Sequence, residues 1–185
     1  MKSAEMTGIR FSVRDMTLMA MMTALIAVCA WVTVPMTIPF TMQTFGMFMA
    51  LKLLGGKRGT VTILLYILLG AAGAPVFSGF RGGISVLAGP TGGYIAGFLL
   101  GGGLYWVTEK WRTNGKRDLA VLLGSLLVCY GFGTVWFMTV MGNRGTPMGL
   151  FQALGLCVVP YILPDLIKLV LAERISGRLR KALKI

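Results

Sequence analysis

The sequence contains no histidine, and its six Asp and Glu face eighteen Lys and Arg in 185 residues. Without histidine the chain lacks the commonest general base and the usual zinc ligand of proteins. Its three cysteines, Cys29, Cys129 and Cys157, each lie within an apolar run, where free cysteine behaves as a small hydrophobe. No phosphate-binding Walker sequence is present, so any ATP hydrolysis would occur in another chain. We therefore expect no disulfide framework, no metal, no cofactor and no enzyme activity.

The composition favours a membrane protein. Hydrophobic residues make up 56% of the chain and charged residues only 13%, which is typical of a polytopic membrane protein rather than a soluble domain. A net charge of +12 could indicate nucleic-acid binding, but that requires Lys and Arg gathered on one soluble face. Here they lie between apolar segments, so we predict a bilayer as partner, no nucleic acid, and a single membrane-embedded domain over residues 1–185.

Turns rich in glycine, proline and charge divide the chain into apolar segments. These predict an all-α fold with six transmembrane helices, over residues 16–34, 40–54, 60–74, 92–107, 119–141 and 160–173, the last preceded by a short apolar run over 148–159. The second and third segments are shorter than the ~20 residues that a full span needs, so they could cross only in part. We expect Gly131 and Gly133 to interrupt the fifth helix, because glycine weakens helices. In the fourth, Gly93, Gly97 and Gly101 recur every four residues and predict a seam for close helix contact.

The distribution of Lys and Arg predicts the orientation. Fifteen of the eighteen lie at the two ends of the chain and in the connections that would share their side of the membrane. Only two, Arg81 and Arg144, lie in connections on the opposite side, and Lys168 lies within the last segment. Since Lys and Arg accumulate on the cytoplasmic side, we predict that both termini are cytoplasmic, including segment 1–14 and a basic tail over 174–185. The glycine-rich loop over 77–94, between the third and fourth helices, would then lie outside.

Asp165 and Lys168 place an acid and a base within the last apolar segment. They are three residues apart and so share one face of a helix, although each charge costs roughly 2.5–3.5 kcal/mol at the middle of a bilayer. Two interpretations are open: a mutual ion pair that holds helices together, or a pair that lines a solvent-filled cavity and binds a polar ligand. Pro160 and Pro164 favour the second, because proline suits the first turn of a helix and therefore places the pair near the outer face.

The loop over 77–94 holds six glycines and Arg81. Irregular backbone at membrane depth persists only where it is buried in protein or faces water, so we expect a loop folded over a cavity. Arg81 offers a planar fork for a carboxylate, Lys168 a point donor and Asp165 an acceptor, a set that matches a small anion with a neutral polar head such as a cyclic urea. The apolar part of such a ligand would be covered by aromatic residues, namely Phe77, Phe80, Tyr94 and Tyr161.

Several motifs together resemble the BioY family, the biotin-binding S components of energy-coupling factor transporters. They are Pro39-Phe40-Thr41-Met42-Gln43-Thr44, Leu68-Leu69-Gly70 through Pro75-Val76-Phe77, Arg81-Gly82-Gly83, Gly89-Pro90-Thr91-Gly92-Gly93-Tyr94 and Asp165-Leu166-Ile167-Lys168. The resemblance covers roughly residues 16 to 173.

The resemblance implies a vitamin-capture subunit of the prokaryotic plasma membrane that binds biotin at its outer side. Its partners would be a transmembrane coupling protein and two cytoplasmic ATPases, with Ala20 and Ala24 of the first helix docking on the coupling protein. An amide found in the third loop of some members is absent, so Ser78 or Ser85 would replace it. The candidate binding residues are Asp165, Lys168, Arg81, Gln43, Thr41, Tyr94, Phe77, Ser78, Ser85 and Tyr161. The alternatives are an S component for another small vitamin and a small membrane enzyme that uses Asp165 as base or a cysteine as nucleophile.

Overall fold

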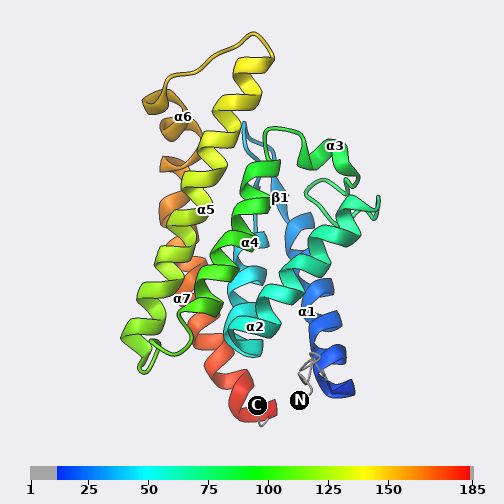
Figure 1. Cartoon of the computed structure of the whole chain (residues 1–185), viewed down its shortest axis with the longest axis vertical. Coiled ribbons are helices and arrows are strands. Elements are labelled where there is room, and N and C mark those ends of the chain that lie inside the picture. The colour runs from blue at the N-terminus through cyan, green and yellow to red at the C-terminus, as the bar shows by residue number, and fades with distance from the viewer. Residues whose placement is uncertain (1–11, 184–185) are drawn as a thin grey trace, which may run out of the picture.

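A computed structural model describes residues 12–183, which form helices joined by short connections and one two-stranded antiparallel ribbon (Figure 1). The ribbon pairs Thr33 with Thr41 and Val34 with Phe40 across the proline-containing turn after the first helix. The elements are α1 Val13–Trp31, β1 Thr33–Val34, β2 Phe40–Thr41, α2 Gln43–Ala71, α3 Ile84–Leu87, α4 Gly92–Val107, α5 Gly115–Asn143, α6 Leu150–Cys157 and α7 Val159–Leu183. The predicted all-α membrane fold is confirmed.

Helix α2 is folded back on itself at Gly55. This glycine has φ 82° and ψ 179°, outside the helical region and in the left-handed half of the map that favours glycine. The amide nitrogen of Gln43 donates to the Tyr66 hydroxyl at 3.0 Å. A straight helix would separate these two residues by about 35 Å, so the halves of α2 lie antiparallel. The two segments predicted on either side of the Gly55 turn are therefore separate helical rods.

Helices α1, α4, α5 and α7 run roughly along the long axis of the bundle, and α7 follows α6 after a bend of 42° (Figure 1). Among the described residues, α1, α2 and α5 are long and apolar enough to cross a membrane, and α6 with α7 makes a fourth candidate if the bent pair is one span. Because α2 is folded and α4 has only 16 residues, six crossings remain a prediction.

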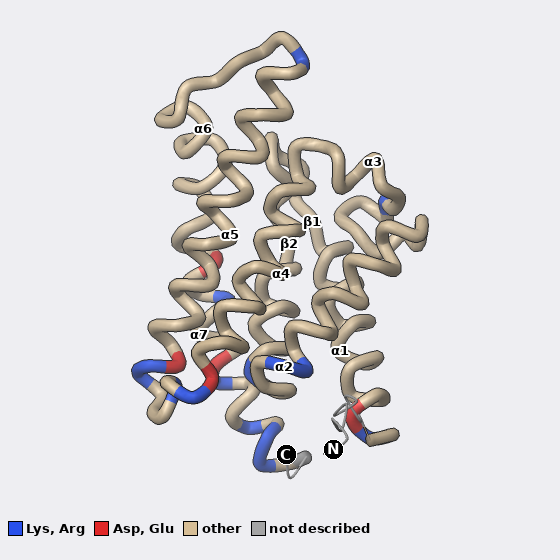
Figure 2. The backbone as a smooth tube through the Cα atoms, viewed as in Figure 1, with Lys and Arg blue, Asp and Glu red and all other residues tan. Residues whose placement is uncertain are grey.

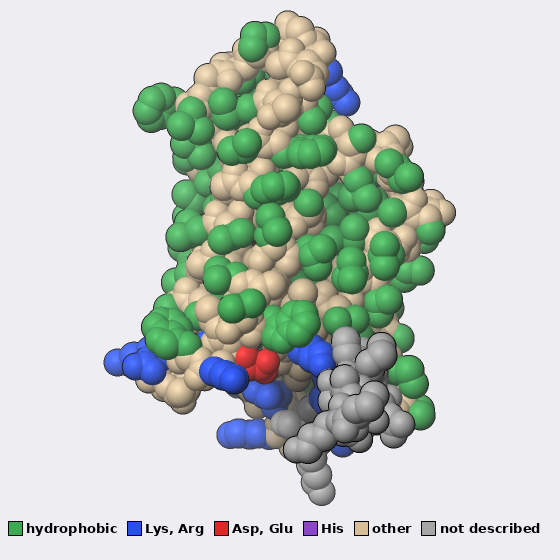
Figure 3. Space-filling view, in the orientation of Figure 1, with side chains coloured by type: hydrophobic (Ala, Val, Ile, Leu, Met, Phe, Trp, Pro, Cys, Tyr) green, Lys and Arg blue, Asp and Glu red, His purple; other side chains and the backbone are tan. Residues whose placement is uncertain are grey.

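The surface is largely apolar along the middle of the bundle and strongly charged at one end. Hydrophobic side chains are spread over the whole visible face between the two ends (Figure 3). Most Lys and Arg gather where α1 begins, α4 passes into α5 and α7 ends (Figure 2). Helix α7 continues ten residues beyond Glu173, to Leu183, so the described part of the predicted tail is helical. Residues 1–11 and 184–185 of the two predicted terminal segments lie outside the described residues.

An ion-pair cluster at this charged end was not foreseen from the sequence. Lys52 of α2 pairs with Asp118 of α5 and lies 2.6 Å from Glu173 of α7. Asp118 also accepts from Arg112 at 2.7 Å and from the Tyr105 hydroxyl at 2.8 Å. Buried charges are tolerated where they are paired in this way, and the cluster ties α2, α4, α5, α7 and the α4–α5 turn together.

The glycine seam of α4 is confirmed. A Cβ atom added at Gly93 would meet Trp136, one at Gly97 would lie 2.9 Å from the Cα of Cys129, and one at Gly101 would lie 2.8 Å from the carbonyl oxygen of Ser125. All three partners belong to α5, so the missing side chains allow the two helices to pack backbone to backbone.

The expected interruption of the fifth helix is wrong. Helix α5 runs unbroken from Gly115 to Asn143 through both Gly131 and Gly133. Gly133 leaves room for a tertiary contact, because a Cβ atom there would lie 2.2 Å from the ring of Tyr94. Packing against α4 therefore outweighs the low intrinsic helix propensity of glycine.

Candidate functional site

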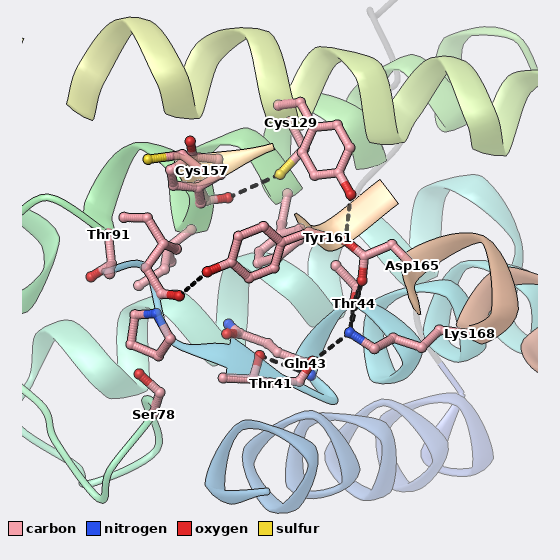
Figure 4. Close-up of a pocket in the computed structure, with 16 residues that line it drawn as sticks. Thr41, Gln43, Thr44, Ser78, Thr91, Cys129, Cys157, Tyr161, Asp165 and Lys168 are labelled. Atoms are coloured by element: carbon pink, nitrogen blue, oxygen red, sulfur yellow. Dashed lines mark hydrogen bonds and ion pairs between the residues drawn. The ribbon is translucent and has the colours of Figure 1, made fainter. Parts of the chain in front are cut away.

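The acid and the base of the last segment form an ion pair. Helix α7 begins at Val159, with Pro160 in its first turn as predicted, and places Asp165 and Lys168 one turn apart. The Lys168 ammonium lies 2.7 Å from Asp165 Oδ1, and the two residues are only 3% and 4% exposed (Figure 4). A buried charge requires such a partner, so the interpretation as a mutual ion pair holds.

Three further residues complete the hydrogen bonding of this pair. The Thr44 hydroxyl of α2 donates to Asp165 Oδ1 at 2.8 Å, and the Tyr130 hydroxyl of α5 donates to Oδ2 at 2.6 Å. Lys168 donates to the Thr41 carbonyl at 2.6 Å and to Thr44 at 3.1 Å. The three ammonium protons of Lys168 are therefore all used, whereas a carboxylate has about four acceptor positions and Asp165 uses three. The remaining acceptor position is on Oδ2.

The ion pair also faces a cavity of about 70 Å³, referred to below as the inner pocket. The pair is thus both an ion pair and part of a pocket wall, and the two interpretations of the sequence are compatible. Seven of the ten predicted binding residues line the inner pocket: Asp165, Lys168, Thr41, Gln43, Ser78, Tyr94 and Tyr161. Tyr161 is held there by donating to the Ile38 carbonyl (Figure 4).

The inner pocket includes residues that the sequence did not indicate. Thr44 lies in a motif that was recognised, but its contact with Asp165 crosses 121 residues of chain. Tyr130 lies on a helix that carries no local signal for a polar site. The other additions are Ile38, Pro39, Thr91, Ile95, Phe98, Cys129 and Cys157. All three cysteines of the chain are free and buried, as expected.

A second, wider cavity of about 450 Å³, the outer cavity, adjoins the inner pocket. Arg81, Ser85 and Arg144 are among its lining residues, and it shares Pro39 and Thr91 with the inner pocket. Arg81 and Ser85 therefore belong to the outer cavity and not to the inner pocket. The Arg81 Nε donates to the Ser78 carbonyl at 3.1 Å, so this hydrogen bond connects a residue of the outer cavity with a residue of the inner pocket.

Phe77 and Phe80 do not line either cavity. Phe77 is 1% exposed and packs edge-on against Tyr66, with ring centroids 5.6 Å apart. Phe80 stacks on Trp31 with centroids 4.9 Å apart. Both residues therefore fix the loop against the bundle instead of covering a ligand.

The glycine-rich loop is folded and attached to the helices. The Gly83 N–H donates to the Gly70 carbonyl at 2.7 Å, and the Trp136 indole of α5 donates to the Gly89 carbonyl at 3.0 Å. Three residues of the range 77–94, Ser78, Thr91 and Tyr94, line the inner pocket. The loop therefore contributes to the wall of the inner pocket, and its role as a cover over a bound ligand stays a prediction.

The predicted docking residues Ala20 and Ala24 are exposed on α1. They lie four residues apart on a helix whose buried side, which includes Met19, Thr23 and Ile26, faces the bundle. Their exposure leaves a strip of small side chains open to a neighbouring helix.

Comparison with known proteins gives consistent results. The protein-family model described as "BioY family" matches residues 1–185. "Biotin transporter BioY" of Thermotoga maritima is 41% identical over 161 residues, which cover 86% of this chain and 91% of that protein. "Probable biotin transporter BioY" of Pyrococcus horikoshii is 38% identical over 171 residues, which cover 89% and 97%. A solved structure, "Crystal structure at 2.1 A of the S-component for biotin from an ECF-type ABC transporter", matches with TM-score 0.80 and 29% identity and covers 91% of this chain and 92% of that one.

Proposed function

The chain belongs to the BioY family, and we propose that it takes up biotin as the substrate-binding S component of an energy-coupling factor transporter. It is a multi-pass membrane protein and not an enzyme. The observation that carries the proposal is the buried Asp165–Lys168 pair, which keeps one acceptor position at the wall of a pocket. We place the protein in a prokaryotic plasma membrane, with this pocket toward the outer face.

The inner pocket offers hydrogen-bonding partners to the polar head of biotin, which is a cyclic urea. Its ring N–H groups need acceptors, and the free position on Asp165 Oδ2 is one. The carbonyl of the urea needs a donor. Because the protons of Lys168 are engaged by Thr41, Thr44 and Asp165, a ligand carbonyl would share or replace one of these bonds. Tyr94 and Tyr161 supply the apolar walls that such pockets use to enclose a ligand.

The sizes of the two cavities support a ligand that spans both. Pockets for small molecules usually measure about 300–1,000 Å³, which exceeds the 70 Å³ of the inner pocket. The outer cavity, at about 450 Å³, falls within that range and shares Pro39 and Thr91 with the inner pocket. We therefore place the ring inside, the chain of the ligand between Pro39 and Thr91, and its carboxylate outward, within reach of the planar fork of Arg81.

Transport requires partners that this chain does not contain. The partners we propose are a transmembrane coupling protein, which would dock on α1 at Ala20 and Ala24, and two cytoplasmic ATPases. A partner can drive release only if it favours a state that binds biotin poorly. The movement we propose is a tilt of the whole subunit in the bilayer, which would carry the occupied pocket inward.

The surroundings of the cysteines do not support the enzyme alternative. A thiol nucleophile needs an adjacent base, and the sequence has no histidine. The thiol of Cys129 instead donates to the Tyr94 carbonyl at 3.4 Å.

Native mass spectrometry of the purified protein tests the proposed function. Protein from cells grown with biotin should carry a bound molecule of the mass of biotin, and calorimetry should show biotin binding that excess thiamine or riboflavin does not displace. An S component for another vitamin would carry a different mass. Protein that binds no biotin in either measurement would refute the proposal.

A further inference from the structure

The outer cavity has an excess of positive charge. Arg81 and Arg144 are its charged lining residues, and no Asp or Glu is among the described residues that line it. Every acid among residues 12–183 is paired with another cation: Asp15 with Arg58, Glu109 and Asp118 with Arg112, Glu173 with Lys52, and Asp165 with Lys168. Within the described chain, no carboxylate therefore neutralises the two arginines of this cavity.

Helix α5 fixes the position of Arg144. Its Trp136 is attached to the glycine-rich loop through the indole bond to the Gly89 carbonyl and packs on Gly93. Arg144 follows eight residues later, about 12 Å farther along the helix axis. Its N–H still bonds to the carbonyls of the last helical turn, and Gly145, at φ 78°, then turns the chain away. Arg144 is therefore held at the rim by a regular helix that is itself anchored to the loop carrying Arg81.

We propose that Arg144 is a specificity-determining residue, which with Arg81 draws the carboxylate end of the ligand to the mouth of the site. The inference rests on the proposed function, because it assumes a ligand whose polar head enters the inner pocket and whose anionic end stays outside. Arg144 is exposed, so we assign it an electrostatic attraction on the approaching carboxylate through solvent and not a direct contact with it. Charges of one sign around a cleft raise the local concentration of the opposite charge and accelerate association. The outer cavity thus selects anionic ligands over uncharged analogues with the same ring.

The test compares biotin with biotin methyl ester, which keeps the ring and lacks the charge. Association rate constants are measured by stopped flow on the full chain in detergent for the wild type, Arg144→Gln and Arg144→Lys. With Arg144→Gln, the rate constant for biotin should fall about threefold to tenfold at low ionic strength, and that for the ester should not change. Arg144→Lys keeps the charge and should behave as the wild type. In 1 M salt, where the Debye length is about 3 Å, the effect on biotin should disappear.

Arg174→Gln is the matched control, because it removes an exposed cation from α7 at the opposite end. It should leave both rate constants unchanged. Equal rate constants for biotin in the wild type and Arg144→Gln would overturn the inference, and so would an equal loss for biotin and ester. A wild-type protein that binds neither ligand is a different result, which would refute the proposed function and this inference with it.

Discussion

The hydroxyl of Tyr130 lies 2.6 Å from Asp165 Oδ2 and donates a hydrogen bond to it from the neighbouring helix. Oδ1 is occupied by Thr44 and Lys168, so Tyr130 sets the orientation of the oxygen that keeps a free acceptor position. A hydrogen bond to a charged group contributes about 1.5–3 kcal/mol. Tyr130 therefore positions the acceptor that a ligand N–H would use.

Replacing Tyr130 by Phe should lower the affinity for biotin roughly tenfold or more. The change removes only the hydroxyl, so Asp165 loses one hydrogen-bond donor and the orientation of its Oδ2 atom is no longer fixed. Isothermal titration calorimetry in detergent measures the effect. Tyr105→Phe is the control, since it removes a tyrosine that donates to Asp118 at 2.8 Å in the opposite ion cluster. If both variants bound biotin equally well, Tyr130 would have no role in positioning Asp165.

Replacing Asp165 by Asn should abolish measurable biotin binding and also destabilise the protein. Asn keeps the shape but leaves the Lys168 ammonium buried without a counter-charge, and breaking a buried pair costs about 3–5 kcal/mol. The double variant Asp165→Asn, Lys168→Met removes the orphaned charge as well. Its thermal unfolding temperature should therefore recover, whereas biotin binding should not.

These two readouts separate a structural role of the pair from a binding role. Thermal unfolding followed by tryptophan fluorescence reports stability, and calorimetry reports affinity. A double variant that recovered both stability and biotin affinity would show that the pair only holds helices together.

The features predicted correctly from the sequence are those that depend on near neighbours in the chain. The spacing of Asp165 and Lys168 is enough to bring them to one helix face. Pro160 marks the start of α7 because proline fits a first turn. The fourth helix was predicted with the bounds that the structure shows, Gly92–Val107, because charge and glycine delimit it on both sides.

The features that were missed depend on packing between distant segments. Tyr130 meets Asp165 across 35 residues, and Lys52 meets Asp118 across 66. The low helix propensity of glycine also led to the wrong prediction of an interruption at Gly133, where contact with the Tyr94 ring keeps α5 continuous. Phe77 was predicted to cover the apolar part of the ligand because it is aromatic, but its ring fills the space left by Gly70. No local pattern distinguishes such a core residue from a pocket residue.

Replacing Gly97 by Ala should destabilise the contact between α4 and α5 by about 1–3 kcal/mol, the usual cost of overpacking. The new Cβ would lie 2.9 Å from the Cα and 3.0 Å from the carbonyl oxygen of Cys129, and backbone atoms cannot move aside as a flexible side chain can. Gly103→Ala is the control on the same helix, because apart from the neighbouring backbone of α4 no atom lies within 4 Å of its added Cβ. Thermal unfolding should show a lower midpoint for Gly97→Ala only. Equal midpoints for both variants would mean that the seam is not tightly packed.

Replacing Ala24 by Leu should block uptake without affecting binding. Ala24 is exposed on α1, so a larger side chain there meets lipid and leaves the bundle intact, but it prevents the close approach of a partner helix. Ala120→Leu makes the same change at an exposed alanine of α5 and serves as the control. In cells that also express the coupling protein and the two ATPases, labelled biotin should accumulate at least tenfold more slowly with Ala24→Leu than with Ala120→Leu. The two purified variants should bind biotin equally well. Equal accumulation would remove Ala24 from the docking surface, and weaker binding by Ala24→Leu would assign this alanine to the fold instead.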